Sequence, residues 1–202
     1  ASRAQTMAEL RGWERLIALQ LEYSLVTRDI EHEFVGLGTQ LGMGVIAWSP
    51  LASGLLSGKY RPGEAGEGRL AQLKDSGNPA FEKFTERNWA IVAELERVAE
   101  DVDRSMAQVA MQWVARRPGV ASVLIGASKL HQLEDNLAAL DQELPAELLE
   151  RLDAASVQDP PFPYTFFTLG MQAMLTGGAT VGDEPADYRR PLLLDAEPAG
   201  VE

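Results

Sequence analysis

Apolar and polar positions follow two different periods along residues 1–157 of the chain. Short apolar runs, typical of buried strands, occupy residues 16–25, 45–48 and 120–125. Between these runs, apolar residues recur every three or four positions, as they do on the buried face of a helix. This second period predicts helices over residues 2–12, 30–41, 80–102, 106–116, 130–139 and 146–155.

Capping residues and helix breakers support several of these boundaries. Gly12 is expected to end the first helix, and Asp29 is expected to cap the second. Ser105 is expected to cap the helix that Pro118-Gly119 ends. Residues 61–79 are rich in Gly, Pro and charge, so they predict a loop that is long enough to be mobile or functional.

The order of the elements predicts an α/β fold. Helices alternate with strands, which favours parallel strands joined by right-handed helical crossovers. Three strands cannot close a (β/α)8 barrel, which needs about 250 residues. The pattern alone therefore leaves two architectures open, an open parallel sheet or a segment of a barrel.

Two parts are expected along the chain. Residues 1–157 carry the regular pattern and suit one domain with its own core. Residues 158–202 are rich in Pro, Gly and aromatic residues, and they become acidic over residues 183–202. We expect this second part to be a C-terminal loop and acidic tail, extended or partly disordered.

Composition narrows the classes of function. The net charge of −12 and the pI of about 4.7 argue against a nucleic-acid partner, which would need a basic stripe. Because the chain has no cysteine, disulfides and thiolate metal sites are excluded. This is compatible with the cytoplasm, where we expect the protein to act. No apolar run approaches the roughly 20 residues that span a bilayer, so no membrane partner is expected.

The beginning of the chain predicts a longer polypeptide. The first methionine is Met7, and residues 1–5 lack the apolar core of a signal peptide. We therefore expect the chain to start inside a longer protein or to act with a separate piece.

The segment from Trp48 to Tyr60 carries the clearest chemical signal. It follows the apolar run 44–47 and breaks at once into serines and glycines. A buried strand that ends in such a turn and enters a helix exposes backbone N–H groups at the helix start. Those groups favour anions, so the segment predicts a phosphate-binding turn.

Two strand segments resemble the NADP-dependent aldo-keto reductases. Residues 20–25, Gln-Leu-Glu-Tyr-Ser-Leu, resemble the sixth strand of that family. Residues 48–51, Trp-Ser-Pro-Leu, together with residues 54–60, resemble its seventh strand and following loop.

Two further segments extend the resemblance in the same order. Residues 107–114 resemble the helix before the family's eighth strand. Residues 125–129, followed by Gln132, Asp135 and Asn136, resemble the eighth strand and the helix that clamps the cofactor. The likeness runs from about residue 2 to residue 156. Four motifs in order are far more specific than any one of them.

The resemblance implies the C-terminal portion of a (β/α)8 TIM barrel, open unless a partner completes it. The family holds an extended nicotinamide cofactor across the C-terminal ends of its strands and transfers hydride to a carbonyl. Its catalytic Asp, Tyr, Lys and His come from the first four strands, which would precede this chain. No catalytic residue is assigned, and the isolated chain is expected to be inactive. His32 and His131 lie outside the family's catalytic motif and are expected on the surface.

The resemblance places the nicotinamide and the pyrophosphate on the first two motifs. Gln20 would hydrogen-bond the nicotinamide carboxamide, and Trp48 would stack on the ring. The residues alone favour a place in the core for Trp48, whereas the resemblance favours stacking. Lys59 would add a charge beside the phosphates, although a solvated lysine accounts for it equally well. The residues around the pyrophosphate would be Ser49, Pro50, Leu51, Ser53 and Gly54.

The resemblance places the adenosine on the last motif. Lys129 would bind the 2′-phosphate, which favours NADP over NAD. Gln132 stands where the family often has Arg, which removes one phosphate-binding charge. Asn136 would hydrogen-bond the adenine edge with Asp135 nearby, while a polar helix face is the simpler account. The strand-to-helix turn beside them is formed by Gly126, Ala127, Ser128 and Lys129.

Three functions remain open at this point. The first is an NADP-dependent reductase of small carbonyl substrates, in which this chain supplies the cofactor-binding half and the missing N-terminal half supplies catalysis. The second is a non-catalytic NADP-binding or interaction module, as in potassium-channel β subunits of the family. The third is a half-barrel that pairs with a second copy of itself, since exposed sheet edges invite pairing.

Overall fold

The computed structural model describes residues 1–64, 68–141, 143–179 and 182. The chain forms two compact units, residues 1–157 and residues 158–202, which are taken separately below. In the part of the chain that the structure describes, no helix combines the length and the apolar character needed to cross a membrane.

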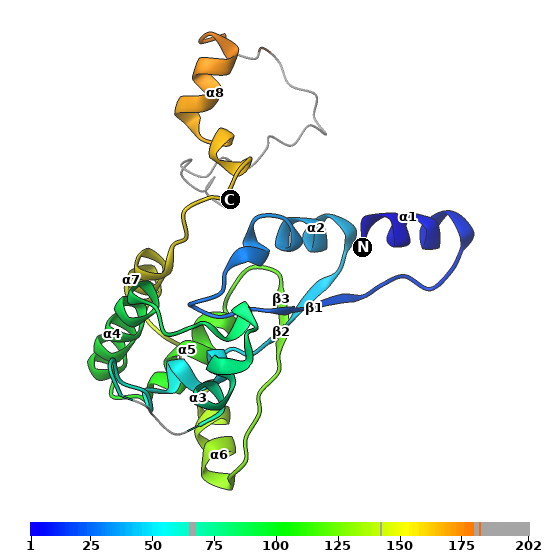
Figure 1. Cartoon of the computed structure of the whole chain (residues 1–202). Helices are drawn as coiled ribbons and strands as arrows, with labels where there is room; N and C mark the ends of the chain where they lie inside the picture. The colour runs from blue at the N-terminus through cyan, green and yellow to red at the C-terminus, as the bar shows by residue number, and fades with distance from the viewer. Residues whose placement is uncertain (65–67, 142, 180–181, 183–202) are drawn as a thin grey trace. The chain divides into compact units, whose positions relative to one another are not determined.

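A sheet of three parallel strands forms the centre of the first unit (Figure 1). The strands are β1 (Ala18–Glu22), β2 (Gly44–Trp48) and β3 (Val120–Val123), and β2 lies between the other two. β1 and β2 pair in a regular parallel register that sets Glu22 opposite Trp48. The prediction of an open α/β sheet with three parallel strands is thus confirmed.

Side chains alternate between the two faces of the sheet. On one face Val45 and Ala47 are buried in the main hydrophobic core. Helix α2 (Phe34–Leu41) contacts β1 and β2, and helix α5 (Met106–Ala115) contacts β3. On the other face Gln20 and Trp48 are exposed, although parallel sheets are usually covered on both faces.

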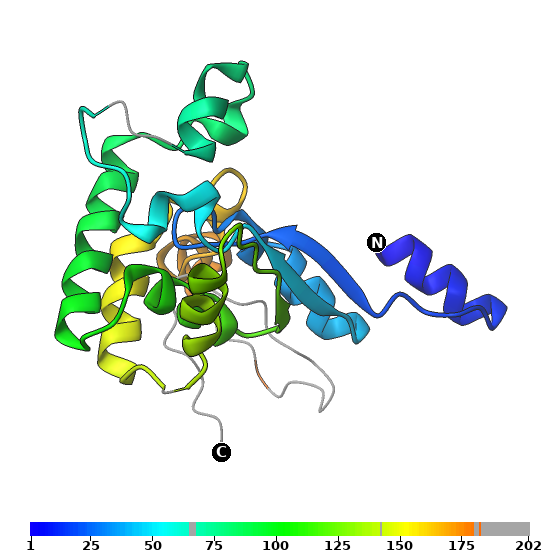
Figure 2. The ribbon, with the colours of Figure 1, turned by 90° about the horizontal axis from the view of Figure 1, so that it is seen from below.

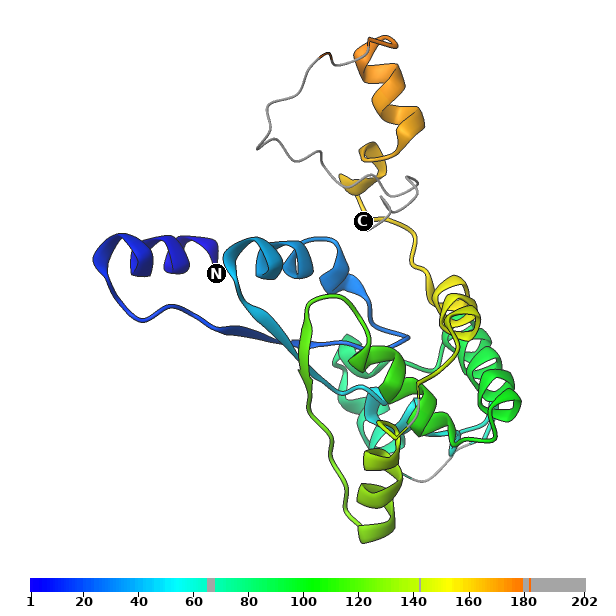
Figure 3. The same ribbon diagram turned by 180° about the vertical axis from the view of Figure 1, so that it is seen from behind.

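An outer layer of helices covers the core (Figures 1 and 3). Helix α4 (Glu86–Asp101) lies beside helix α7 (Ala146–Ser156) in this layer. A long segment leads from β3 to helix α6 (Leu130–Ala138). The stripe of α4 that faces inward is fully buried at Ile91, Leu95 and Val98, as its apolar period predicts.

Two of the predicted helix boundaries are confirmed by backbone geometry. Helix α1 (Ser2–Arg11) ends at Gly12, which has a left-handed φ of 64°. Ser105 caps α5, because its hydroxyl accepts a hydrogen bond from the backbone N–H of Gln108.

Two predicted helix starts are wrong. Asp29 does not cap α2; residues Asp29–Glu31 form a 3-10 turn, and α2 begins only at Phe34. The Arg28 side chain donates two hydrogen bonds to the Glu31 carboxylate and so holds this turn. Helix α4 begins at Glu86 rather than at residue 80, because the Thr85 side chain caps it there.

The predicted loop over residues 61–79 contains regular structure (Figure 2). Helix α3 (Arg69–Leu73) and the 3-10 turns Lys74–Ser76 and Pro79–Phe81 interrupt it. Leu70 explains this order, since it is fully buried and its backbone N–H donates to the Tyr60 hydroxyl at 3.1 Å.

The second unit contains some regular structure where composition predicts an extended or partly disordered tail. It contains a 3-10 turn (Tyr164–Phe166) and helix α8 (Leu169–Thr176). Thr168 caps α8 through the Met171 N–H, and Gly177 ends the helix with a φ of 61°. The acidic segment 183–202 lies outside the described residues.

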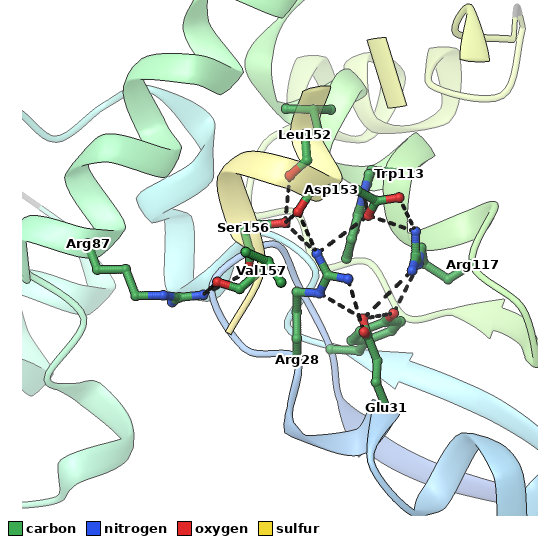
Figure 4. A network of polar contacts seen from close by, with 10 residues as sticks. Arg28, Glu31, Arg87, Trp113, Arg117, Leu152, Asp153, Ser156 and Val157 are labelled. Carbon is green, nitrogen blue, oxygen red and sulfur yellow. Dashed lines mark hydrogen bonds and ion pairs between the residues drawn. The ribbon is translucent and has the colours of Figure 1, made fainter. Parts of the chain in front are cut away.

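A polar network joins the chain after β1 to α7 (Figure 4). Arg28 donates from Nε to Glu31 at 2.8 Å and from Nη1 to the Ser156 hydroxyl at 2.7 Å. Arg87 donates to the backbone oxygen of Ser156 at 2.8 Å. These cations lie at the C-terminal end of α7, where the helix dipole favours positive charge.

The indole of Trp113 lies inside the same network. It is fully buried, and its Nε1 donates to Asp153 at 3.0 Å. The guanidinium carbons of Arg28 and Arg117 lie 5.1 and 4.8 Å from the ring centroid, within cation–π range. The network therefore fixes the helix layer relative to the C-terminal end of β1.

Candidate functional site

A cavity of about 1310 Å³ opens at the carboxyl ends of the three strands. Glu22 closes β1, Trp48 closes β2, and residues 124–128 follow β3; all of them line the cavity. Ligands of parallel α/β folds bind at this end of the strands, because the loops that follow the strands converge there. The cavity is therefore the candidate site.

The structure brings most of the predicted cofactor residues together in this cavity. Thirteen of the fifteen line it: Trp48, Ser49, Pro50, Leu51, Ser53, Gly54, Lys59, Gly126, Ala127, Ser128, Gln132, Asp135 and Asn136. Gln20 and Lys129 do not. Gln20 lies on the exposed sheet face, opposite Ile46 and two residues before Glu22.

Trp48 forms part of the cavity wall rather than of the core. Its side chain is 41% exposed, while its strand neighbour Ala47 is fully buried. The alternation of the strand turns the indole toward the open face and the cavity. A flat aromatic ring at a strand end is available for stacking on a planar ligand.

The turn after Trp48 is held in an unusual backbone conformation. Ser49, Ala52 and Ser53 have φ values of 58°, 48° and 57°, and Gly54 follows with 93°. Residues with side chains seldom adopt this left-handed region, and such strain concentrates at ligand-binding turns. The segment Ala52–Ser57 is a kinked 3-10 helix, so the helix predicted after this turn is shorter and tighter than an α-helix.

Glycines allow the Lys59 side chain to lie close to two turns. A Cβ on Gly54 would lie 2.6 Å from Lys59 Nζ, and one on Gly68 would lie 2.9 Å from it. Both glycines have positive φ. Lys59 is thus held between the turn after β2 and the start of α3.

Arg69 adds a second cation to the cavity, and sequence reasoning did not single it out. It begins α3 and lines the cavity with Lys59. Neither residue forms an ion pair with a carboxylate of residues 1–64 or 68–141. The only signal for Arg69 is its place in a Gly-rich loop after the phosphate-binding turn, which also suits a solvated residue.

Gln132 organises the turn at the start of α6. Its Oε1 accepts hydrogen bonds from the Ser128 N–H at 3.0 Å, the Ser128 hydroxyl at 3.1 Å and the Lys129 N–H at 3.2 Å. These donors are the groups that an anion would use at a helix N-terminus. His131, expected on the surface, is exposed and also lines the cavity.

Asp135 and Asn136 have different environments. The Asp135 carboxylate accepts from the Ser105 hydroxyl and from Gln108 Nε2, both at 2.8 Å, and so joins α6 to α5. Asn136 is only 7% exposed and lines the cavity, and its side chain forms no hydrogen bond with the residues that the structure describes. An amide that lines the cavity and bonds to no described residue is suited to a ligand.

A buried ion pair borders the cavity at the end of β1. Lys83 Nζ donates to Glu22 Oε1 at 2.8 Å and to the Thr27 hydroxyl at 3.0 Å, and Lys83 is 8% exposed. Sequence reasoning missed Lys83, because a lysine between Glu82 and Phe84 near the start of the predicted helix over residues 80–102 is typical of a solvated side chain.

Known proteins resemble this chain in sequence. The model of the Aldo/keto reductase family matches residues 1–157. A protein named probable voltage-gated potassium channel subunit beta, from Oryza sativa subsp. japonica, is 36% identical over 148 residues, which are 72% of this chain and 45% of the relative.

Two bacterial relatives are similarly close. L-glyceraldehyde 3-phosphate reductase of Escherichia coli (strain K12) is 39% identical over 145 residues, 69% of this chain and 41% of the relative. The uncharacterized oxidoreductase YrpG of Bacillus subtilis (strain 168) is 33% identical over 153 residues, 75% of this chain and 44% of the relative. The chain therefore spans less than half the length of these relatives.

Proposed function

We propose that this chain, which belongs to the aldo/keto reductase family, forms the cofactor-binding half of an NADP-dependent reductase of small carbonyl compounds. Family membership supports an oxidoreductase function. The choice of NADP, the carbonyl substrate and the division into two halves are our proposal. The observation that carries it is the cavity at the strand ends, whose wall holds an exposed indole, the amide of Asn136 and two cations that form no ion pair with the described residues.

The cavity suits a dinucleotide better than a small metabolite. Its volume of about 1310 Å³ exceeds the roughly 300–1,000 Å³ typical of pockets for drug-sized ligands. Trp48 would hold the nicotinamide, Lys59 and Arg69 the phosphates, and Asn136 the adenine edge. Lys129, exposed at the start of α6, stays our candidate for the 2′-phosphate.

The chain's own residues would position and shield the cofactor. The Trp48 ring would exclude water from one face of a bound nicotinamide and fix which face is open, which is catalysis by orientation. When bound, the cofactor supplies the hydride that reduces the carbonyl carbon. The left-handed turn at Ser49 and Ser53 would present neutral donors to the pyrophosphate.

Catalysis requires a second segment. By resemblance, the family's Asp, Tyr, Lys and His lie on its first four strands, and we assign none of them to this chain. The exposed sheet face at Gln20 and Trp48 is the surface against which those strands would pack. A second copy of this chain is the alternative occupant of that face.

A second candidate is a non-catalytic NADP-binding or interaction module. It is favoured by the relative from Oryza sativa subsp. japonica, whose name describes a channel subunit rather than an enzyme. Both candidates bind the cofactor at the same site, but only the reductase turns over a carbonyl substrate.

Calorimetric titration of the full chain with NADPH tests the shared site. We expect Trp48→Ala to weaken NADPH binding by at least about tenfold, as the loss of one stacking contact predicts. Trp13→Ala is the matched control, since Trp13 is 56% exposed and does not line the cavity. A chain that binds no NADPH, or equal losses in both variants, would contradict the proposal. Turnover of an aldehyde by the whole protein would separate the reductase from the module.

A further inference from the structure

The ion pair between Glu22 and Lys83 lies at the end of the cavity assigned to the nicotinamide. Glu22 is the β1 residue in register with Trp48, and adjacent strands lie about 4.8 Å apart. Both residues line the cavity. The Glu22 carboxylate is therefore the nearest acidic group on the neighbouring strand to the exposed indole.

Lys83 holds this carboxylate from a rigid position. Its backbone oxygen accepts a hydrogen bond from Asn88 Nδ2 at 2.9 Å, and Asn88 is 7% exposed. Asn88 lies in the first turn of α4, whose cap is the Thr85 side chain. The ammonium is thus fixed by the start of a helix rather than by a freely moving loop.

A buried ammonium is costly to desolvate, so its presence requires explanation. The hydrophobic residues of the core would satisfy packing at lower cost than a lysine that needs a carboxylate partner. The pair leaves the wall beside Trp48 with no net charge. Removing either partner would leave one full charge there, of opposite sign in the two cases.

The two states of a nicotinamide differ by one charge on the ring. The oxidised ring is cationic and the reduced ring is neutral, so a net charge in the wall affects them differently. We infer that Lys83 is a positioning residue that neutralises Glu22 and thereby sets the relative affinity of the site for oxidised and reduced cofactor. This inference rests on the proposed function.

The test measures the dissociation constants of NADP⁺ and NADPH for the full chain by calorimetry at pH 8. Lys83→Met leaves Glu22 unpaired and should favour NADP⁺ over NADPH on the order of tenfold relative to the wild type, as one partly screened unit charge predicts. Glu22→Gln leaves Lys83 unpaired and should shift the ratio of the two constants in the opposite direction.

The double variant Glu22→Gln/Lys83→Met is the matched control. It carries no charge at either position and should restore the wild-type ratio, even if both affinities fall. If Lys83→Met alone does not fold, the other two variants still test the inference. Glu22→Gln should shift the ratio of the two dissociation constants toward NADPH, and the double variant should leave it at the wild-type value.

The outcomes separate this inference from the proposed function. A wild type that binds neither dinucleotide would contradict the proposed function. A wild type that binds both, with variants that lose affinity equally for both forms, would show that the pair is only structural and would overturn the inference. Opposite shifts in the ratio would establish it.

Discussion

Arg117 donates from Nη1 to both carboxylate oxygens of Asp153, each at 2.7 Å, and so joins the turn that follows α5 to α7. Burial opposes the charge on Arg117, but Tyr23 and Asp153 outweigh it and raise the pKa of its guanidinium. The pair lies in the network around Trp113, which connects the helix layer to the end of β1.

Replacing Arg117 with Met should therefore destabilise the chain. Breaking a fully buried pair costs about 3–5 kcal/mol, and partial exposure reduces that cost. The side chains of Arg117 and Asp153 are 21% and 36% exposed, so we expect a loss of about 1–3 kcal/mol in the free energy of urea unfolding.

The neighbouring pair Arg116–Glu143 is the control for this prediction. Its side chains are 50% and 74% exposed, and Arg116→Met should change the unfolding free energy by no more than about 0.5 kcal/mol. Equal losses in both variants would refute the assignment of Arg117 to a structural network.

Tyr23 should make stability depend on pH in the alkaline range. Burial raises the pKa of its phenol well above the usual value, and the charge of Glu31 and the hydrogen bond to it raise the pKa further. A group whose pKa is higher in the folded state contributes stability that is complete below its unfolded pKa of about 10 and is lost as pH rises above it.

The Tyr23→Phe variant checks this sign. It lacks the hydrogen bonds to Glu31 at 2.6 Å and from Arg117 at 3.2 Å, so it should be less stable than the wild type near pH 8. The difference in unfolding free energy should shrink between about pH 10 and pH 11. A difference that stays constant over this range would show that the phenol does not titrate with unfolding.

Gly54→Ala should reduce cofactor binding more than it reduces stability. The added Cβ would displace the end of the Lys59 side chain, which lies 2.5–2.6 Å from its position. Because that side chain is flexible, the cost to folding should be mainly that of a left-handed alanine, about 1–2 kcal/mol. The affinity for NADPH should fall about tenfold, as expected when a charge leaves the phosphate site.

Gly63→Ala provides a matched comparison. Gly63 has a similar positive φ of 78°, and no atom of the described residues lies within 4 Å of its added Cβ. It should lose a similar amount of stability while keeping the NADPH affinity of the wild type. Loss of affinity in both variants would argue against a role for Lys59 at the phosphates.

Gln132→Arg should increase the preference for NADPH over NADH. A guanidinium at the start of α6 adds a positive charge that can bind the 2′-phosphate of NADPH. The ratio of the NADPH affinity to the NADH affinity should therefore rise about tenfold. The variant also loses the three hydrogen bonds that Gln132 accepts, which should cost about 1 kcal/mol of stability. Gln132→Met shares this loss without the charge, and a rise in the ratio for Met as well would contradict the charge argument.

Local rules predicted the elements whose determinants lie close together in the sequence. The Ser105 cap, the Gly12 stop and the three strand positions follow from neighbouring residues, and the structure confirms each. Asp29 failed because the choice between cap and turn depends on Arg28, whose other partners lie on α7 more than 120 residues away.

Only part of the candidate site was predicted from the sequence, because some of its residues are brought together by long-range contacts. Motif resemblance identified the turn at Ser49 and the helix at Asn136, because each is a short contiguous stretch. Arg69 lies in the predicted loop and Lys83 in the predicted helix over residues 80–102; only tertiary contacts bring Arg69 to the cavity and Lys83 to Glu22. The cofactor roles of all fifteen residues stay predictions, and Gln20 and Lys129 do not line the cavity.

The order β1-β2-β3 leaves each outer strand with one side that no described strand pairs. In evolutionary terms, the residues that line the cavity from Glu22 to Asn136 belong to one contiguous stretch of chain. A single exchanged stretch would therefore carry the whole described wall together with the register between β1 and β2.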